Sequence, residues 1–191
     1  MKKLRLIFIF LLACCILPEI QAQKVAVKSN LLYDATTTFN LGVEFGLARK
    51  WTLDVPVNMN PWKFSDGMRL RHWGIQPEVR YWFCERFRRT FIGLHAHYAD
   101  FNVGNLPNWS FISENMRQNR YEGHLYGAGF SVGHAWILKR RWGIEATLGV
   151  GYARIVYDKY PCAVCGSRLK SGNRNYFGPT KVGISLIYLI K

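Results

Sequence analysis

Apolar and polar side chains alternate one by one along most of the chain after residue 23, a period that predicts strands with unlike surroundings on their two faces. Phe39–Ala48 shows the pattern best: five apolar side chains lie on one face, and the other face carries Asn40, Gly42, Glu44, Gly46 and Ala48. The closing segment Gly178–Lys191 alternates from Lys181 onward. Both segments have about the 9–11 residues that a tilted strand needs to cross a bilayer.

Eight such segments follow one another, separated by turns and loops. Short charged turns after the second, fourth and sixth segments alternate with longer loops after the third, fifth and seventh, the last loop being Asp158–Phe177. Pro56 lies inside the third segment and predicts a bulge or local break there, because proline cannot donate to a ladder. The predicted strands are Lys24–Tyr33, Phe39–Ala48, Trp51–Met59, Leu70–Phe83, Thr90–Asp100, Arg120–Leu138, Trp142–Tyr157 and Gly178–Lys191.

This arrangement predicts an all-β fold, an eight-stranded antiparallel up-and-down transmembrane β-barrel. An apolar face opposite a glycine-rich face with isolated charges suits lipid outside and a narrow polar lumen inside. A soluble lipocalin-like barrel that binds a small ligand has the same period with its faces exchanged, but the glycine-rich face would solubilise an exterior poorly. Aromatic residues near strand ends fit girdles at the membrane interfaces: Trp51, Trp73, Trp82, Trp136, Trp142 and Tyr188.

The start of the chain carries a targeting pattern. Met1–Ala22 has a basic start and an apolar run, Leu6–Leu17, which predicts a cleavable signal peptide. Residues 23–191 then form the barrel domain, in the outer membrane of a Gram-negative cell. A lipoprotein cleavage box with lipidated Cys14 is the alternative, although the apolar run continues past that cysteine. No later apolar run reaches the 18 residues typical of a transmembrane helix.

The chain is strongly basic, with 26 Lys and Arg against 12 Asp and Glu and a net charge of +14. Such a charge suits nucleic acid or anionic lipid, and the export signal with interleaved aromatic residues favours lipid. We therefore expect outer-membrane lipid and lipopolysaccharide, and not nucleic acid, as partners. Basic loop residues expected to face lipopolysaccharide phosphates are Lys63, Arg69, Arg71, Arg117, Arg120, Lys159, Arg168, Lys170 and Arg174.

Several motifs resemble a Bacteroidota family of small outer-membrane barrels that is catalogued as a domain of unknown function. They are K-V-A-V-K-S-N-L-L-Y-D-A-T-T-T at Lys24–Thr38, Leu53–Trp62, Gly93–Tyr98, Tyr157–Gly166 and the closing Asn175–Lys191. The resemblance implies an outer-membrane barrel and an association with surface-fimbria genes. It supplies no catalytic residue and no cofactor.

Charged side chains fall on the predicted inner faces, where a narrow lumen requires them to be paired. Eight strands leave little room besides side chains, so we expect a packed polar lumen rather than a pore. The candidate network is Glu44, Asp54, Glu78, Arg80, His95, His97, Glu122, His124, Glu145 and Lys181. His95 and His97 also suggest a metal site with an acid or histidine of this set, but no spacing fixes a third ligand. We predict hydrogen bonding, with no metal or cofactor.

Cleavage after residue 22 leaves Cys84, Cys162 and Cys165. The C-x-x-C spacing of the last two is compatible with a redox motif or half of a zinc site, but a second cysteine pair and a βαβ setting are both missing from the sequence pattern. In an exported protein a disulfide between Cys162 and Cys165 is the favoured interpretation, with Cys84 left over.

The expected function is non-enzymatic: a structural, anchoring or surface-assembly role through the external loops. The first alternative is a lipid-modifying enzyme, an acyl hydrolase or transferase, which needs a serine or histidine beside a carboxylate at the lipid interface. His72 and His134 are the nearest candidates, and neither has an evident partner.

Overall fold

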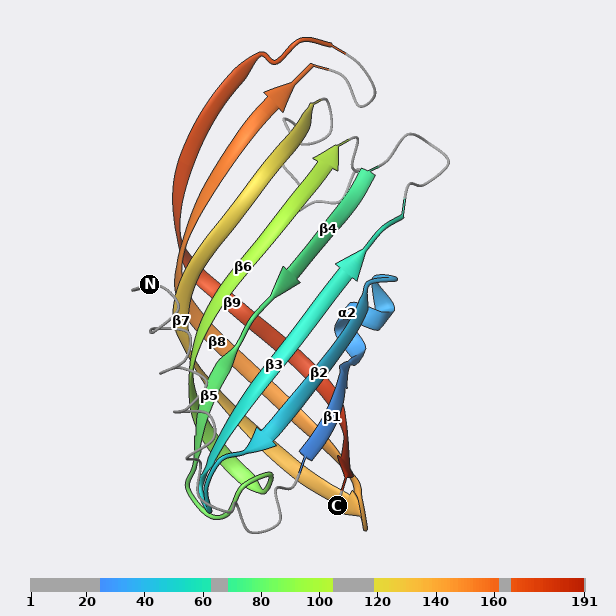
Figure 1. Ribbon diagram of the computed structural model, residues 1–191, viewed down its shortest axis with the longest axis vertical. Helices are drawn as coiled ribbons and strands as arrows, with labels where there is room; N and C mark the ends of the chain where they lie inside the picture. The colour runs from blue at the N-terminus through green and yellow to red at the C-terminus, as the bar shows by residue number, and fades with distance from the viewer. Residues whose placement is uncertain (1–24, 63–68, 105–118, 162–165, 191) are drawn as a thin grey trace, which may run out of the picture.

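The computed structural model describes residues 25–62, 69–104, 119–161 and 166–190, which form nine strands and one short helix (Figure 1). The all-β, antiparallel fold predicted from the alternation is confirmed. No helix in these ranges is long and apolar enough to cross a membrane. The elements are β1 (Val25–Asn30), α2 (Leu31–Ala35), β2 (Phe39–Gly46), β3 (Trp51–Asn60), β4 (Arg69–Ile75), β5 (Glu78–Trp82), β6 (Arg89–Gly104), β7 (Arg120–Lys139), β8 (Trp142–Tyr160) and β9 (Lys170–Ile190). The predicted signal peptide, Met1–Ala22, and the pair Cys162 and Cys165 lie outside the described residues.

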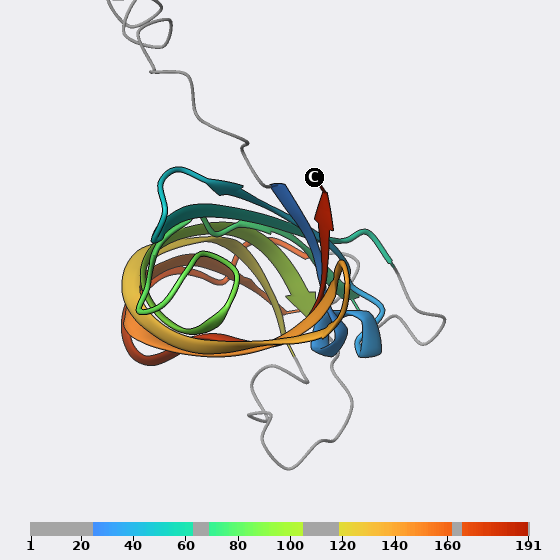
Figure 2. The ribbon, with the colours of Figure 1, turned by 90° about the horizontal axis from the view of Figure 1, so that it is seen from below.

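The strands form one antiparallel sheet that closes on itself. Successive strands pair around the sheet, and β9 pairs with β1, so the ladder makes a complete ring (Figure 2). β4 and β5 share one position, because both pair with β3 on one side and β6 on the other. The nine described strands therefore fill eight positions around the ring.

The fourth predicted strand, Leu70–Phe83, is interrupted rather than continuous. Gln76 and Pro77 separate β4 from β5, and they lie beside Pro56 of β3, whose carbonyl accepts a hydrogen bond from the Gln76 N–H at 3.1 Å. Proline residues on both sides of this point remove donors from the ladder. The break expected at Pro56 thus falls in the partner strand, while β3 runs on through Pro56.

The first predicted strand, Lys24–Tyr33, ends earlier than expected. β1 stops at Asn30, whose side chain caps helix α2 by accepting a hydrogen bond from the Leu32 N–H at 3.1 Å. Asn40 also donates to the Asn30 carbonyl at 3.1 Å. Asparagine at this position favours a helix start over a continued strand. The apolar Leu31 and Leu32 that follow it are equally compatible with a strand, so the sequence pattern alone extends the predicted strand to Tyr33.

The predicted loop Asp158–Phe177 is mostly strand. β8 continues to Tyr160 and β9 begins at Lys170, with Lys159 opposite Lys170. We call these continuations, together with the adjoining ends of β6 and β7, the extension: Asp100–Gly104, Arg120–Leu125, Arg154–Tyr160 and Lys170–Tyr176. The extension rises beyond the ends of β1–β3 (Figure 1).

The two faces of the ring differ sharply in polarity. Large apolar side chains are exposed on the outer face, among them Leu41, Leu94, Phe130, Leu148 and Val182. Buried charges occupy the interior, including Glu44, Glu78, Arg80 and Glu145. A soluble lipocalin-like barrel would carry the opposite distribution, with its apolar face inside and its polar face outside.

Apolar residues fill the end of the interior next to the short turns. Trp82, Phe87 and Phe91 are buried there with Ala26, Ala135 and Ile187. Trp82 packs on Phe91 with ring centroids 4.7 Å apart. The prediction that Trp82 belongs to an interfacial girdle is therefore wrong: it shares its inward face with Glu78 and Arg80 of the same strand.

Candidate functional site

Arg80 lies at the centre of a buried group of charged side chains inside the ring. We call this group the interior charge cluster; its members are Lys28, Glu44, Asp54, Glu78, Arg80, Glu145 and Lys181. The Arg80 side chain is 1% exposed and donates to four carboxylates. The distances are 2.5 Å to Glu78, 2.7 Å to Asp54, 3.0 Å to Glu44 and 3.1 Å to Glu145.

Two lysines complete the pairing. Lys28 of β1 pairs with Glu44 and donates to Glu145 at 2.7 Å. Lys181 of β9 donates to Glu78 at 2.8 Å. The cluster thus joins strands from all around the ring, which ties the interior together across its width.

Hydroxyl groups satisfy further carboxylate oxygens. Thr52 donates to Glu44, Ser131 to Glu78, and Thr147 to Glu145 at 3.0 Å. Gly93 leaves the room that Glu78 needs, because a Cβ at that glycine would lie 2.5 Å from its Oε1. The Asp54 Oδ1 atom alone among the carboxylate oxygens of the cluster is buried without a hydrogen-bond partner.

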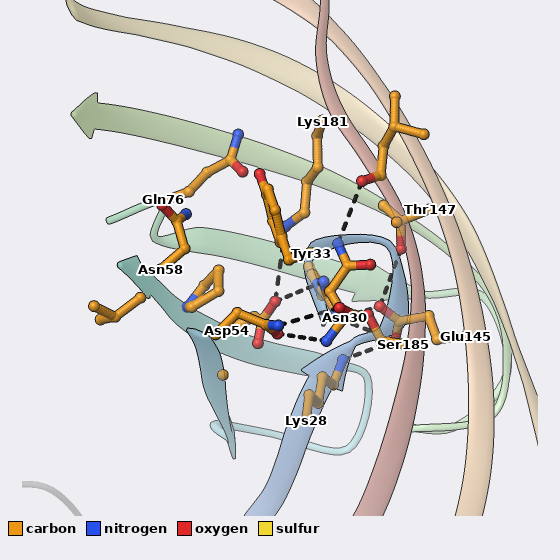
Figure 3. A pocket seen from close by; sticks show the side chains of 17 residues that line it. Lys28, Asn30, Tyr33, Asp54, Asn58, Gln76, Glu145, Thr147, Lys181 and Ser185 are labelled. Carbon is orange, nitrogen blue, oxygen red and sulfur yellow. Dashed lines mark hydrogen bonds and ion pairs between the residues drawn. The ribbon is translucent and has the colours of Figure 1, made fainter. Parts of the chain in front are cut away.

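One cavity adjoins the cluster on the side away from the apolar end, and a second cavity lies beyond it, with Tyr33, Asn58 and Gln76 lining both. The smaller one holds about 50 Å³ and is lined by Lys28, Asp54, Glu145 and Lys181, which reach it from different strands (Figure 3). Such a volume suits a few water molecules. The other cavity, about 300 Å³, lies nearer the extension and is lined by His72, His97, Phe101 and Leu125.

The histidines of the predicted network do not assemble a metal centre. His95 Nε2 lies 2.9 Å from Thr180 Oγ1, and its ring lies 5.8 Å from that of His97. His97 lines the larger cavity and is not ion-paired with the interior charge cluster. Within the described ranges, no group of three histidine, cysteine or acidic side chains is arranged to hold a metal ion.

Glu122 and His124 do not point into the interior, contrary to expectation. They lie on the same face of β7 as the exposed Tyr126, and His124 stacks on both Tyr98 and Tyr126 at 6.2 Å. Side chains two residues apart on a strand share a face, so Glu122 and His124, which precede Tyr126 by four and two residues, point outward with it. Lys28 lies two residues after the buried Ala26 on β1 and therefore shares its inward face. It is the one member of the interior charge cluster that the predicted network lacks.

The candidate enzyme residues have structural partners instead of carboxylates. His72 Nδ1 lies 3.3 Å from the Leu70 carbonyl oxygen, and His134 Nδ1 lies 2.9 Å from Thr90 Oγ1. His134 also packs on Trp136, with centroids 4.7 Å apart. Neither contact supplies the acid that a hydrolytic dyad needs. Cys84 is exposed and free.

Comparison with known proteins shows the family of the chain. No curated protein and no solved structure matches the chain. A family model matches residues 7–190, nearly the whole chain, and bears out the resemblance of its motifs to a domain of unknown function. The chain belongs to the family described as protein of unknown function (DUF3575).

Proposed function

We propose that this protein is a non-enzymatic outer-membrane β-barrel with a packed polar lumen. The observation that carries the proposal is the inverted distribution of polarity: apolar side chains cover the outside of the ring and ion-paired charges fill its inside. In water that outer face would be an unusually large exposed apolar surface. In a bilayer it is the expected lipid-facing surface of a closed sheet.

Aromatic pairs at two levels support membrane insertion. Trp142 packs on Tyr188 near the short turns, with centroids 4.9 Å apart, and Trp73 packs on Tyr98 toward the extension at 5.7 Å. On β8, the exposed Tyr152 lies ten positions after Trp142. At a strand tilt of about 40° this length corresponds to roughly 25 Å, the height of the apolar band of such barrels.

The lumen supports an anchoring role rather than conduction. The interior charge cluster and the apolar residues beside it occupy the inside of the ring, and the cavity next to the charges holds about 50 Å³. A path for solutes would have to separate buried ion pairs, and each separation would leave an uncompensated buried charge at a high cost in free energy. The protein then acts through its external parts, as an anchor or assembly component of the cell surface. Partnership with surface-fimbria proteins stays a prediction of the family resemblance.

Lipid is the proposed partner of the outer face. Arg71 and Arg154 are exposed on that face, near the exposed Tyr98 and Tyr152, at the level where lipopolysaccharide phosphates would lie. Cations at this level attract anionic headgroups.

Gel mobility of the outer-membrane fraction tests the proposal. A closed membrane ring stays folded in detergent without heating, so the unheated sample is expected to migrate differently from the boiled one. Fractionation of the same cells gives the localisation. Recovery in the soluble periplasmic fraction, with identical mobility before and after boiling, contradicts the proposal.

A further inference from the structure

The extension has an inner face that continues the inner face of the ring. Tyr157 and Lys159 follow the buried Ala153 at even spacing along β8, so all three share one face. Register places Lys170 opposite Lys159, and Arg174 opposite Ile155 of the same face. Lys159, Lys170 and Arg174 therefore face the axis of the ring and not the surrounding leaflet, which corrects the expectation that all the loop cations meet lipid phosphates.

Among the described residues, these inward cations have no acidic neighbour on their face. Within the described parts of β7–β9, the inward positions of the extension carry no aspartate or glutamate. Asp158, the acid of this part of β8, lies on the outer face, where Ser171 donates to it at 2.6 Å. Lys170 and Arg174 are exposed. A face with uncompensated, exposed cations attracts an anionic ligand.

An aromatic platform lies between two of the cations. Tyr157 is opposite Gly172, which is midway between Lys170 and Arg174 along β9. The Tyr157 ring rests on that glycine, because a Cβ there would lie 3.1 Å from the ring Cζ. Tyr121 packs edge-on against Tyr157, with centroids 5.6 Å apart, and holds the ring in place.

The spacing selects the kind of ligand. Lys170 and Arg174 are four residues apart, about 13 Å along an extended strand. This distance favours an extended molecule with two or more anionic groups over a single small anion. The ring between the cations offers a flat apolar surface with a polar tip, which suits the apolar face of a sugar.

We propose that the inner face of the extension binds a carboxylated or phosphorylated oligosaccharide. Its anionic groups pair with Lys170 and Arg174, and a sugar ring between them lies on Tyr157. The orientation of this site rests on the proposed function, since in an outer-membrane barrel the extension faces the cell exterior.

Fluorescence anisotropy with a labelled hexagalacturonate, using protein folded in detergent, tests the proposal. The double variant Lys170→Gln/Arg174→Gln is compared with Arg71→Gln/Arg154→Gln, which removes two exposed cations from the outer face. We expect the inner double variant to weaken binding at least about tenfold, as the loss of two charge-assisted contacts implies. The outer double variant should change it less than about twofold. Tyr157→Leu, which keeps the charge, should weaken binding several-fold.

Heat-dependent gel mobility confirms that each variant is folded before binding is measured. Equal weakening by the two double variants overturns the proposal, because binding would then follow net charge alone. Equal affinity for a labelled neutral maltohexaose overturns it as well. A protein that shifts on heating and resides in the outer membrane, yet binds no hexagalacturonate, loses this site but keeps the proposed function. Failure of the heat shift and of membrane residence counts against the proposed function itself.

Discussion

At the scale of single residues, Arg80 determines how the interior charges are satisfied. It is the only side chain that contacts four carboxylates, among the residues that the structure describes. Removing it leaves Glu44, Asp54, Glu78 and Glu145 with only Lys28 and Lys181 as cations, in a space with little water. Uncompensated buried charge of this kind is among the costliest single defects in a protein.

We therefore expect Arg80→Met to destabilise the protein by about 3–5 kcal/mol. The measurement is the denaturant midpoint of the folded band in detergent, at neutral pH. Arg154→Met is the matched control, because Arg154 is exposed on the outer face of β8, and it should change the midpoint little. Equal effects of the two variants would show that the cluster adds nothing beyond a surface charge.

Most of the interior charges are predictable from the sequence, but their partners are not. Alternation along each strand is a local property, so Glu44, Glu78 and Glu145 could be placed on inner faces from neighbouring residues alone. The hydrogen bonds of Arg80 depend on the register of strands that are far apart in the sequence. That register follows from ring closure, which no local pattern encodes.

At the scale of elements, the extension shows where the hydrophobic pattern fails. Lys170–Asn175 is polar on both faces, because this part of β9 meets no lipid in the proposed orientation. Apolar and polar residues therefore do not alternate in this segment, and its sequence pattern resembles that of a loop. Helix α2 was missed for a different reason: the cap formed by Asn30 outweighs the apolar character of the two leucines that follow it.

The outer face of the extension is held in part by Asp158. The hydrogen bond from Ser171, followed by the nearby Arg168 guanidinium, holds the pKa of the Asp158 carboxyl below its usual value. Because the folded pKa is depressed, this contact stabilises the β8–β9 pairing at neutral pH and is lost as pH falls through the folded pKa. We expect Ser171→Ala to raise the pKa of Asp158 in a carboxyl NMR titration. Asn173→Ala, two residues along the same outer face, should leave the pKa of Asp158 unchanged. If Ser171→Ala does not raise this pKa, the hydrogen bond from Ser171 is not its cause.

At the scale of the whole molecule, the fold is predictable because the predicted strands share one pattern, apolar side chains on the outer face alternating with small or polar ones on the inner face. Every predicted strand overlaps a strand of the ring, and the two faces differ as the alternation requires. Closure itself rests on the pairing of β1 with β9, whose register joins Val25 to Ile190. The membrane around the ring is an inference from the outer face, so the decisive experiments are those that change that face.

Phe130 offers the sharpest test of that inference. It is 70% exposed, lies opposite Leu94 and Val150 of the neighbouring strands, and stands between Tyr126 and Trp136 along β7. In a bilayer, Phe130→Lys puts a charge near the midplane and should cost about 2–4 kcal/mol of folding free energy. The measurement is the folded fraction in phospholipid vesicles across a urea series. Asn173→Lys adds the same charge to the outer face of the extension and should have little effect. If the outer face met water instead, Phe130→Lys would relieve an exposed apolar patch, so unchanged folding with improved solubility would argue that the ring does not reside in a membrane.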